Sequence, residues 1–205
     1  DIKPDFIITY RHLHSDAWRL PYSLGEHLDV LTQVVNTPVL VIPHPDHENF
    51  LTEMLLNTNR VMAITDHITG QSELIDYSFH FTEKKGKLIL CHIEDEMAFD
   101  KYVDAFSKIP EIDTTVAKEE LNKRLLKEPM DYIASCEKEL IKKDESLEIE
   151  AVVKMGKHLE NYRYLVQKYE IDLLIMNSKD NEQMAMHGMA YPLAVELRDL
   201  ALLLL

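Results

Sequence analysis

Ile171-Asp-Leu-Leu-Ile-Met176 is an apolar run of strand length, and it leads through a loop, the pair His187-Gly188 and a helical stretch to a second apolar run at residues 202–205. Short continuous apolar runs of this kind are typical of parallel strands that are buried on both faces of a sheet. A strand, a helix and a second strand in this order predict a parallel pair joined by a right-handed crossover. The end of the chain therefore predicts an α/β fold.

The same plan occurs a second time near the amino terminus. Pro4-Asp-Phe-Ile-Ile-Thr9 is followed by a loop, by Leu24-Gly25, by a helical stretch that Ser23 is expected to cap, and by Val39-Leu-Val-Ile42. The spacing from the glycine to the last strand is the same in both segments. We infer that the chain contains an internal repeat.

The residues between the two repeats complete one of them. Further strands are predicted at residues 60–65, 87–93 and 148–153, and further helices at residues 71–84 and 157–169. With the strands at 172–176 and 200–205, five strands alternate with helices, which predicts a doubly wound, five-stranded, mostly parallel sheet in a Rossmann-like three-layer fold.

Two other stretches define the expected organisation. Turn formers gather at residues 57–59, which predicts a partial unit at residues 1–45, a linker at 46–59 and a nearly complete unit at 60–205. Residues 96–145 are highly charged and carry leucine and isoleucine at helical spacing around Pro110 and Pro129. They predict two or three helices that cover one face of the sheet.

The repeated plan resembles the carboxyl-terminal half of a universal stress protein domain, and Asn36-Thr-Pro-Val-Leu-Val-Ile42 is its most characteristic piece. Val61-Met-Ala-Ile-Thr-Asp66 resembles that family's first strand with its terminal Asp, and Ala151-Val-Val-Lys-Met-Gly156 its third strand with a following Gly. The resemblance implies the adenine nucleotide alpha hydrolase-like fold and a tandem protein. Its first domain would be represented here only by its carboxyl-terminal half.

The resemblance also raises the question of ATP, because family members that bind it carry a G-x-x-G, nine-residue gap, G-[S/T] loop whose amides approach the phosphates. Residues 177–189 retain only the last glycine, Gly188, and the hydroxyl position is Met189. In the partial unit, Gly25 is followed by Glu26. We therefore expect no cofactor and weak or absent ATP binding.

A vestigial nucleotide site is the alternative. Asp66 and Gly156 match positions at which the family contacts the base and the ribose, and Lys179 offers positive charge to one phosphate. Together with Gly188 these residues form the candidate site for an AMP-like or ATP-like ligand.

No residue set predicts catalysis or a metal centre. His44-Pro-Asp-His-Glu48 is interpreted as a surface loop, and Asp66-His67 as the end of a strand. Cys91 and His92 are adjacent in a predicted strand and therefore point to opposite faces of the sheet. We expect a protein that is not an enzyme.

Composition limits the possible partners and the compartment. The formal net charge of −14 repels phosphate backbones, which argues against nucleic-acid binding. The chain has no apolar run near the ~20 residues that cross a bilayer, and two cysteines without paired spacing suit a reducing cytoplasm.

The functional hypothesis is a cytoplasmic regulatory or stress-response module that acts through protein contacts. Residues 39–42 or 201–205 would form sheet edges, to be covered by a second domain or by a second chain in a homodimer. Three alternatives stay open at this point. They are a regulatory domain of a cation/proton antiporter in contact with its membrane domain, a nucleotide-binding universal stress protein, and a nucleotide-binding enzyme such as a hydrolase or transferase.

Overall fold

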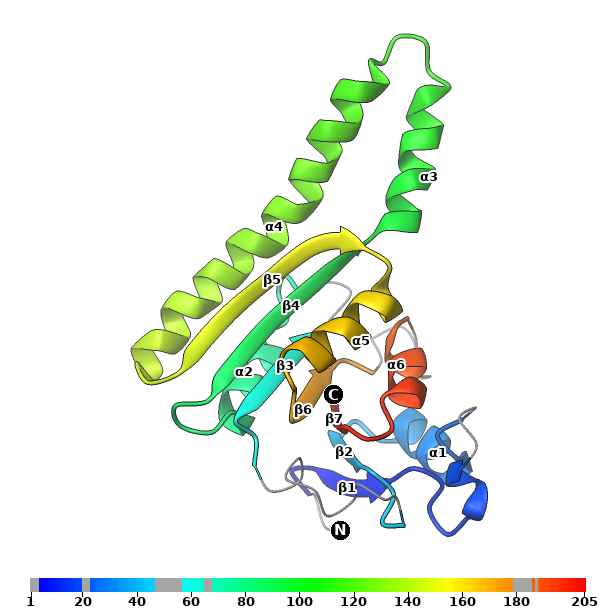
Figure 1. Ribbon diagram of the computed structural model, residues 1–205, viewed down its shortest axis with the longest axis vertical. Helices are drawn as coiled ribbons and strands as arrows, with labels where there is room; N and C mark the ends of the chain where they lie inside the picture. The colour runs from blue at the N-terminus through cyan, green and yellow to red at the C-terminus, as the bar shows by residue number, and fades with distance from the viewer. Residues whose placement is uncertain (1–3, 20–22, 47–56, 65–67, 179–185, 187) are drawn as a thin grey trace.

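The strands form one continuous sheet. The computed structural model describes residues 4–19, 23–46, 57–64, 68–178, 186 and 188–205. Its sheet has seven strands in the order β1-β2-β7-β6-β3-β4-β5 (Figure 1). The strands are β1 (Ile7–Tyr10), β2 (Val39–Ile42), β3 (Arg60–Ile64), β4 (Lys87–Asp95), β5 (Glu148–Gly156), β6 (Leu173–Met176) and β7 (Ala201–Leu204).

The sheet confirms the predicted mostly parallel α/β fold and corrects its strand count. All neighbouring strands are parallel except β2 and β7, which are antiparallel. Residues 60–205 supply the five strands expected of the complete unit. The sheet has seven because β1 and β2 of residues 1–45 are added to it through β2 and β7.

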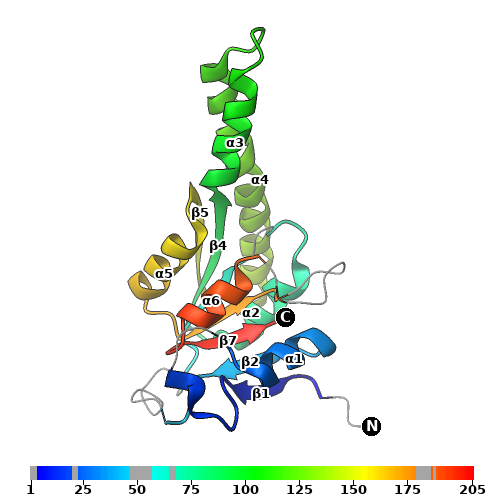
Figure 2. The ribbon, with the colours of Figure 1, turned by 90° about the vertical axis from the view of Figure 1, so that its right-hand side faces the viewer.

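Helices cover both faces of the sheet. One face carries α1 (Glu26–Val34), α5 (His158–Lys168) and α6 (Ala190–Glu196), and the other carries α2 (Ser72–Phe81) and part of α4 (Thr114–Lys143). The remaining helices are η1 (Asp16–Arg19) and α3 (Glu96–Ser107). The result is the predicted arrangement of three layers (Figure 2).

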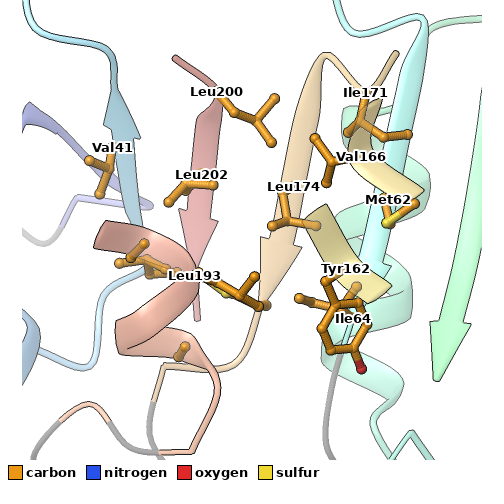
Figure 3. Packing of buried hydrophobic residues seen from close by; sticks show 14 of the residues in the cluster. Val41, Met62, Ile64, Tyr162, Val166, Ile171, Leu174, Leu193, Leu200 and Leu202 are labelled. Carbon is orange, nitrogen blue, oxygen red and sulfur yellow. The ribbon is translucent and has the colours of Figure 1, made fainter. Parts of the chain in front are cut away.

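The strand sequences are continuously apolar because both faces are buried. Met62 on β3 lies beside Leu174 on β6, and Leu174 lies beside Leu202 on β7. Tyr162 and Val166 of α5 cover this row from one side (Figure 3). The alternate residues of the same strands, including Val61 and Ala63 on β3, are buried against α2 and α4.

The antiparallel contact joins the two repeats in a symmetric manner. Val39 pairs with Leu204, Leu40 with Leu203, and Val41 with Leu202. The equal spacing from Gly25 and Gly188 makes Leu40 and Leu203 equivalent residues, so equivalent positions meet at the centre of the contact. A local two-fold axis therefore passes between these two leucines, as in an isologous interface.

Helix α1 begins later than the sequence suggested. The prediction that Ser23 caps it is wrong, because the N-cap is Gly25, with φ of 93° and no side-chain cap. An ideal Cβ at Gly25 would lie 2.8 Å from both the backbone N and the Cα of His12. The close approach of these two backbone segments requires glycine at this position.

The segment 96–145 forms two helices, but it does not simply cover a sheet face. Aspartate side chains cap both helices, Asp95 for α3 and Asp113 for α4. Helix α4 buries Pro129, Ile133 and Leu140 against the sheet. Its first half projects beyond the strands and forms an arm with α3 (Figure 1). The prediction that the helices of residues 96–145 cover one face of the sheet is therefore wrong for this half of α4.

Asp172, at the entry to β6, joins this strand to β3. Its buried carboxylate accepts a hydrogen bond of 2.8 Å from the backbone N–H of Arg60 and lies 3.8 Å from the Arg60 guanidinium. Burial raises the pKa of Asp172 above its ordinary value, and the contacts with Arg60 partly offset this rise. The charged form is thus disfavoured in the folded protein.

This shift predicts how stability depends on pH. The raised pKa means that Asp172 favours folding most below its ordinary pKa of 3.8, and that this contribution is lost as the pH rises through the folded-state value. Asp172→Asn keeps an acceptor for the Arg60 N–H and removes the charge. We expect urea unfolding at pH 7 to show a gain of up to about 1 kcal/mol, which disappears toward pH 3.

Glu170→Gln is the control for this prediction. Glu170 pairs with the same guanidinium but is exposed, so its replacement should leave stability nearly unchanged. A clear loss of stability at pH 7 in Asp172→Asn would mean that the Asp172 charge is needed by Arg60, contrary to the prediction.

Candidate nucleotide site

The natural place for a ligand in this topology is the carboxyl edge of the sheet between β3 and β6. The chain order of the strands reverses there, since β3 leads to β4 on one side while β6 leads to β7 on the other. Open α/β sheets bind ligands at such switch points. Of the predicted site residues, Asp66 and Lys179 lie outside the described residues.

Gly156 is the last residue of β5 and pairs with Asp95 at the end of β4. Strands β3 and β4 lie between β5 and β6, so the sheet order does not bring Gly156 to the switch point. An ideal Cβ at Gly156 would lie 2.4 Å from Nδ2 of Asn161, whose side chain donates to the Lys157 carbonyl. The space beside this glycine is therefore filled by the protein itself.

Gly188 is exposed in the turn before α6, with φ of 56°. The N-cap of α6 is Met189, which makes no side-chain cap hydrogen bond. Helix α6 has only seven residues. The glycine thus supplies a left-handed turn, which accounts for its presence without a ligand.

Two amide side chains that were not predicted span the switch point. Asn177, just after β6, donates from Nδ2 to Oε1 of Gln71 at a distance of 2.9 Å, and Gln71 is the N-cap residue of α2. Next to it, both the backbone N–H and the hydroxyl of Ser178 donate to the carbonyl of Leu205. The sequence positions of Asn177, at a strand end, and Gln71, at a helix start, gave no indication that the two side chains would meet.

The equivalent loop of the partial unit is closed on itself. The backbone N–H of His12 donates to the Leu24 carbonyl, and Nε2 of His12 lies 2.9 Å from the carbonyl oxygen of Ser23. His12 is buried and lies directly against Gly25. The place in front of this glycine, where an anion would approach the helix, is occupied by the His12 backbone.

Arg11 precedes this loop and connects the partial unit to α6. Its guanidinium donates to the carbonyls of Ala194, Leu197 and Arg198 at 2.9, 3.0 and 3.3 Å. Burial lowers the pKa of Arg11 to about 10, so the side chain remains charged at neutral pH. A cation at the carboxyl end of a helix satisfies carbonyls that have no partner within the helix.

Of the other residues considered for chemistry, His44 and Cys91 lie among the described residues and are placed as follows. His44 accepts a hydrogen bond from the Asp46 backbone and contacts the Tyr10 ring. Burial raises the pKa of Cys91 to about 12, which keeps it as a thiol. In the described ranges, no three His, Cys, Asp or Glu side chains are placed to hold a metal ion. No helix of the described part is both long and apolar enough to span a bilayer.

A cavity of about 510 Å³ lies away from the switch point, between α3 and α4. Phe99 and Met155 form apolar parts of its wall, and Lys118 lies over the Phe99 ring. The sheet-facing side of α4 becomes polar here, where Lys118 and Asn122 replace the apolar residues farther along the helix. The oxygen of the Asn122 side chain is buried without a hydrogen-bond partner among the described residues.

Sequence comparison gives no family: no family model and no curated protein sequence matches the chain. Solved structures do show similar folds. The hypothetical protein MJ0577, whose biochemical function was the subject of a structure-based assignment, is 20% identical with a TM-score of 0.54. The match covers 72% of this chain and 96% of that one.

Two structures from Pseudomonas aeruginosa match almost the entire chain. They are the functionally unknown protein PA1789 of strain PAO1 and a candidate universal stress protein of strain UCBPP-PA14, each 12% identical with a TM-score of 0.53. Each match covers 98% of this chain but only 62% and 63% of the respective solved chain. The chain thus has a universal stress protein-like fold.

Proposed function

We propose that the chain is a non-catalytic regulatory or stress-response module of the universal stress protein type, which works in the cytoplasm through protein contacts. The observation that carries the proposal is that, in residues 1–45, the protein itself fills the place where a phosphate would approach the helix. The His12 backbone occupies the space in front of Gly25, and Asn161 occupies the space beside Gly156. The Asn177–Gln71 hydrogen bond spans the switch point.

The same proposal includes a tandem organisation. Residues 1–45 are then the carboxyl-terminal part of a first domain, residues 46–59 a linker and residues 60–205 a second domain. The local two-fold axis between Leu40 and Leu203 supports this division, because it relates two units of one plan. The expectation that residues 39–42 or 201–205 form sheet edges is wrong, because β2 and β7 each have a neighbour on both sides. Among the described strands, the edges at which copies of the chain could pair are β1 and β5.

Calorimetric titration with ATP, AMP and adenosine, each with and without magnesium, tests the function. We expect no binding at micromolar nucleotide. Micromolar ATP binding would overturn the proposal and favour the nucleotide-binding alternative. In that case Lys179→Ala should weaken ATP binding at least ~10-fold. Lys143→Ala is the control and should not change it, because Lys143 is the last residue of α4, at the end of that helix away from the switch point.

A further inference from the structure

The cavity between α3 and α4 belongs to the arm and lies away from the switch point. Its volume of about 510 Å³ is within the range of small-molecule sites. The lining comes from the first turns of α3, from the first half of α4 and from Met155 near the end of β5. Thr114 and Asn122, which both line it, lie about 12 Å apart along α4. The cavity is therefore elongated and follows the arm (Figure 1).

Carboxylates dominate the charge of this lining. Glu96 and Asp100 come from α3 and Glu119 from α4, whereas Lys118 is the only basic residue among the described residues of the lining. In the part of the chain that the structure describes, none of the three carboxylates forms an ion pair. Three carboxylates beside one ammonium group attract a cationic ligand and repel a phosphate.

The carboxylates are spread along the cavity and do not meet at one point. Glu96 and Asp100 are four residues apart and so lie on one face of α3, and Glu119 lies on the opposite helix. Within the described ranges, no three His, Cys, Asp or Glu side chains are placed to hold a metal ion. This distribution favours an extended ligand with several positive charges over a single compact cation.

Apolar groups lie among these charges. The Phe99 side chain is 5% exposed, and together with Met155 it forms apolar parts of the wall. The ammonium nitrogen of Lys118 lies 6.0 Å from the centroid of the Phe99 ring, at the outer limit of a cation–π contact. The wall thus offers surface for methylene groups and an aromatic face that already has a cation above it.

Asn122 contributes an acceptor that lacks a donor. Its Oδ1 atom is buried without a hydrogen-bond partner among the described residues, and the residue lines the cavity. Buried polar atoms in folded proteins nearly always have a partner, because leaving one unpaired lowers stability. An N–H group of a ligand in the cavity would supply the missing donor.

We propose that the cavity between α3 and α4 binds a linear aliphatic polyamine, a chain of methylene groups with two or more protonated amines. The three carboxylates of the lining hold the protonated amines. The methylene groups pack against Phe99 and Met155, and one ammonium N–H donates to Oδ1 of Asn122. The proposal goes beyond the proposed function and does not depend on it, because the cavity lies away from the switch point.

Titration of the 205-residue chain with spermidine tests the proposal. Salt at about 0.15 M screens the diffuse attraction of the ligand to a chain with a net charge of −14. We expect calorimetry to show one spermidine per chain with a Kd below about 100 μM, and the NMR signal of the Met155 methyl group to shift. Absence of binding would overturn the proposal, and so would binding that leaves the Met155 signal unchanged. Displacement of spermidine by an equal concentration of magnesium would also overturn it.

Charge variants of α4 locate the site. Glu119→Gln should weaken spermidine binding at least ~5-fold, whereas Glu128→Gln, at an exposed position of the same helix outside the lining, should leave it unchanged. Lys118→Met should strengthen binding roughly 5-fold, because it removes the positive charge from the lining and uncovers the Phe99 ring. Equal affinities of the two glutamine variants would mean that spermidine binds the acidic surface in general, contrary to the proposal.

Asn122→Leu separates ligand binding from folding. Since Oδ1 of Asn122 has no donor among the described residues, its removal should not lower stability in urea unfolding. The same variant should bind spermidine at least ~5-fold more weakly, because the acceptor for the ammonium group is lost. Unchanged affinity in a folded Asn122→Leu protein would contradict the role assigned to this side chain.

Discussion

Arg11→Met is expected to lower the free energy of unfolding by about 3 kcal/mol, because three backbone carbonyls at the end of α6 lose their charged donor. Met retains much of the side-chain volume, so the change reports on hydrogen bonding more than on packing. Urea unfolding followed by circular dichroism measures the effect. Arg11→Lys should recover only part of it, since an ammonium does not reproduce the guanidinium fork.

The matched control is Arg163→Met, which removes a second arginine that contacts α6. Arg163 forms a 3.5 Å ion pair with Glu196, and both side chains are well exposed. Exposed pairs contribute about 0–1 kcal/mol, so this variant should remain close to the parent protein. Equal losses in Arg11→Met and Arg163→Met would show that the buried guanidinium does not hold the two units together.

Gly25→Ala is expected to cost a similar amount, about 3 kcal/mol, from two sources that add. The φ of 93° is unfavourable for any residue with a side chain, and the new methyl group would lie 2.8 Å from two backbone atoms of His12. Backbone atoms in a closed loop cannot move aside as a flexible side chain can. Thermal unfolding should show a clear decrease in Tm.

Gly70→Ala separates the two sources. Gly70 also has a positive φ, of 83°, but nothing lies within 4 Å of the added methyl group. We expect this variant to lose only about 1 kcal/mol, from backbone strain alone. If both variants lost the same amount of stability, the contact between Gly25 and His12 would not be tight, and His12 would not fill the space in front of Gly25.

The fold could be predicted because its signals are local. Apolar runs such as those at β3 and β6 are buried on both faces, and their order along the chain fixes a parallel sheet. The number of strands in the whole sheet depended on the pairing of β2 with β7, which lies between residues far apart in sequence. The arm of α3 and the first half of α4 was not predicted. The helical spacing of residues 96–145 indicates helices but not the point at which a helix extends beyond the sheet.

The candidate site was predictable only in part. The loss of loop glycines is visible in the sequence, and Gly188 does lie in the turn just before α6. The Asn177–Gln71 and Arg11–α6 contacts join residues that are 106 and at least 183 positions apart, and single residues of these types carry no pairing signal. The closed state of the His12 loop also follows from tertiary geometry alone.

The pairing of β2 with β7 within one chain has a consequence for how the two halves can change. In a homodimer, every substitution appears on both sides of the axis. Here the two segments related by the axis belong to one chain, so they are encoded separately and always occur in a one-to-one ratio. Their sequences already differ. Arg11 reaches across to α6, whereas its counterpart in the repeat, Ser178, bonds to Leu205. One half is thus free to acquire a new contact while the other keeps its original one.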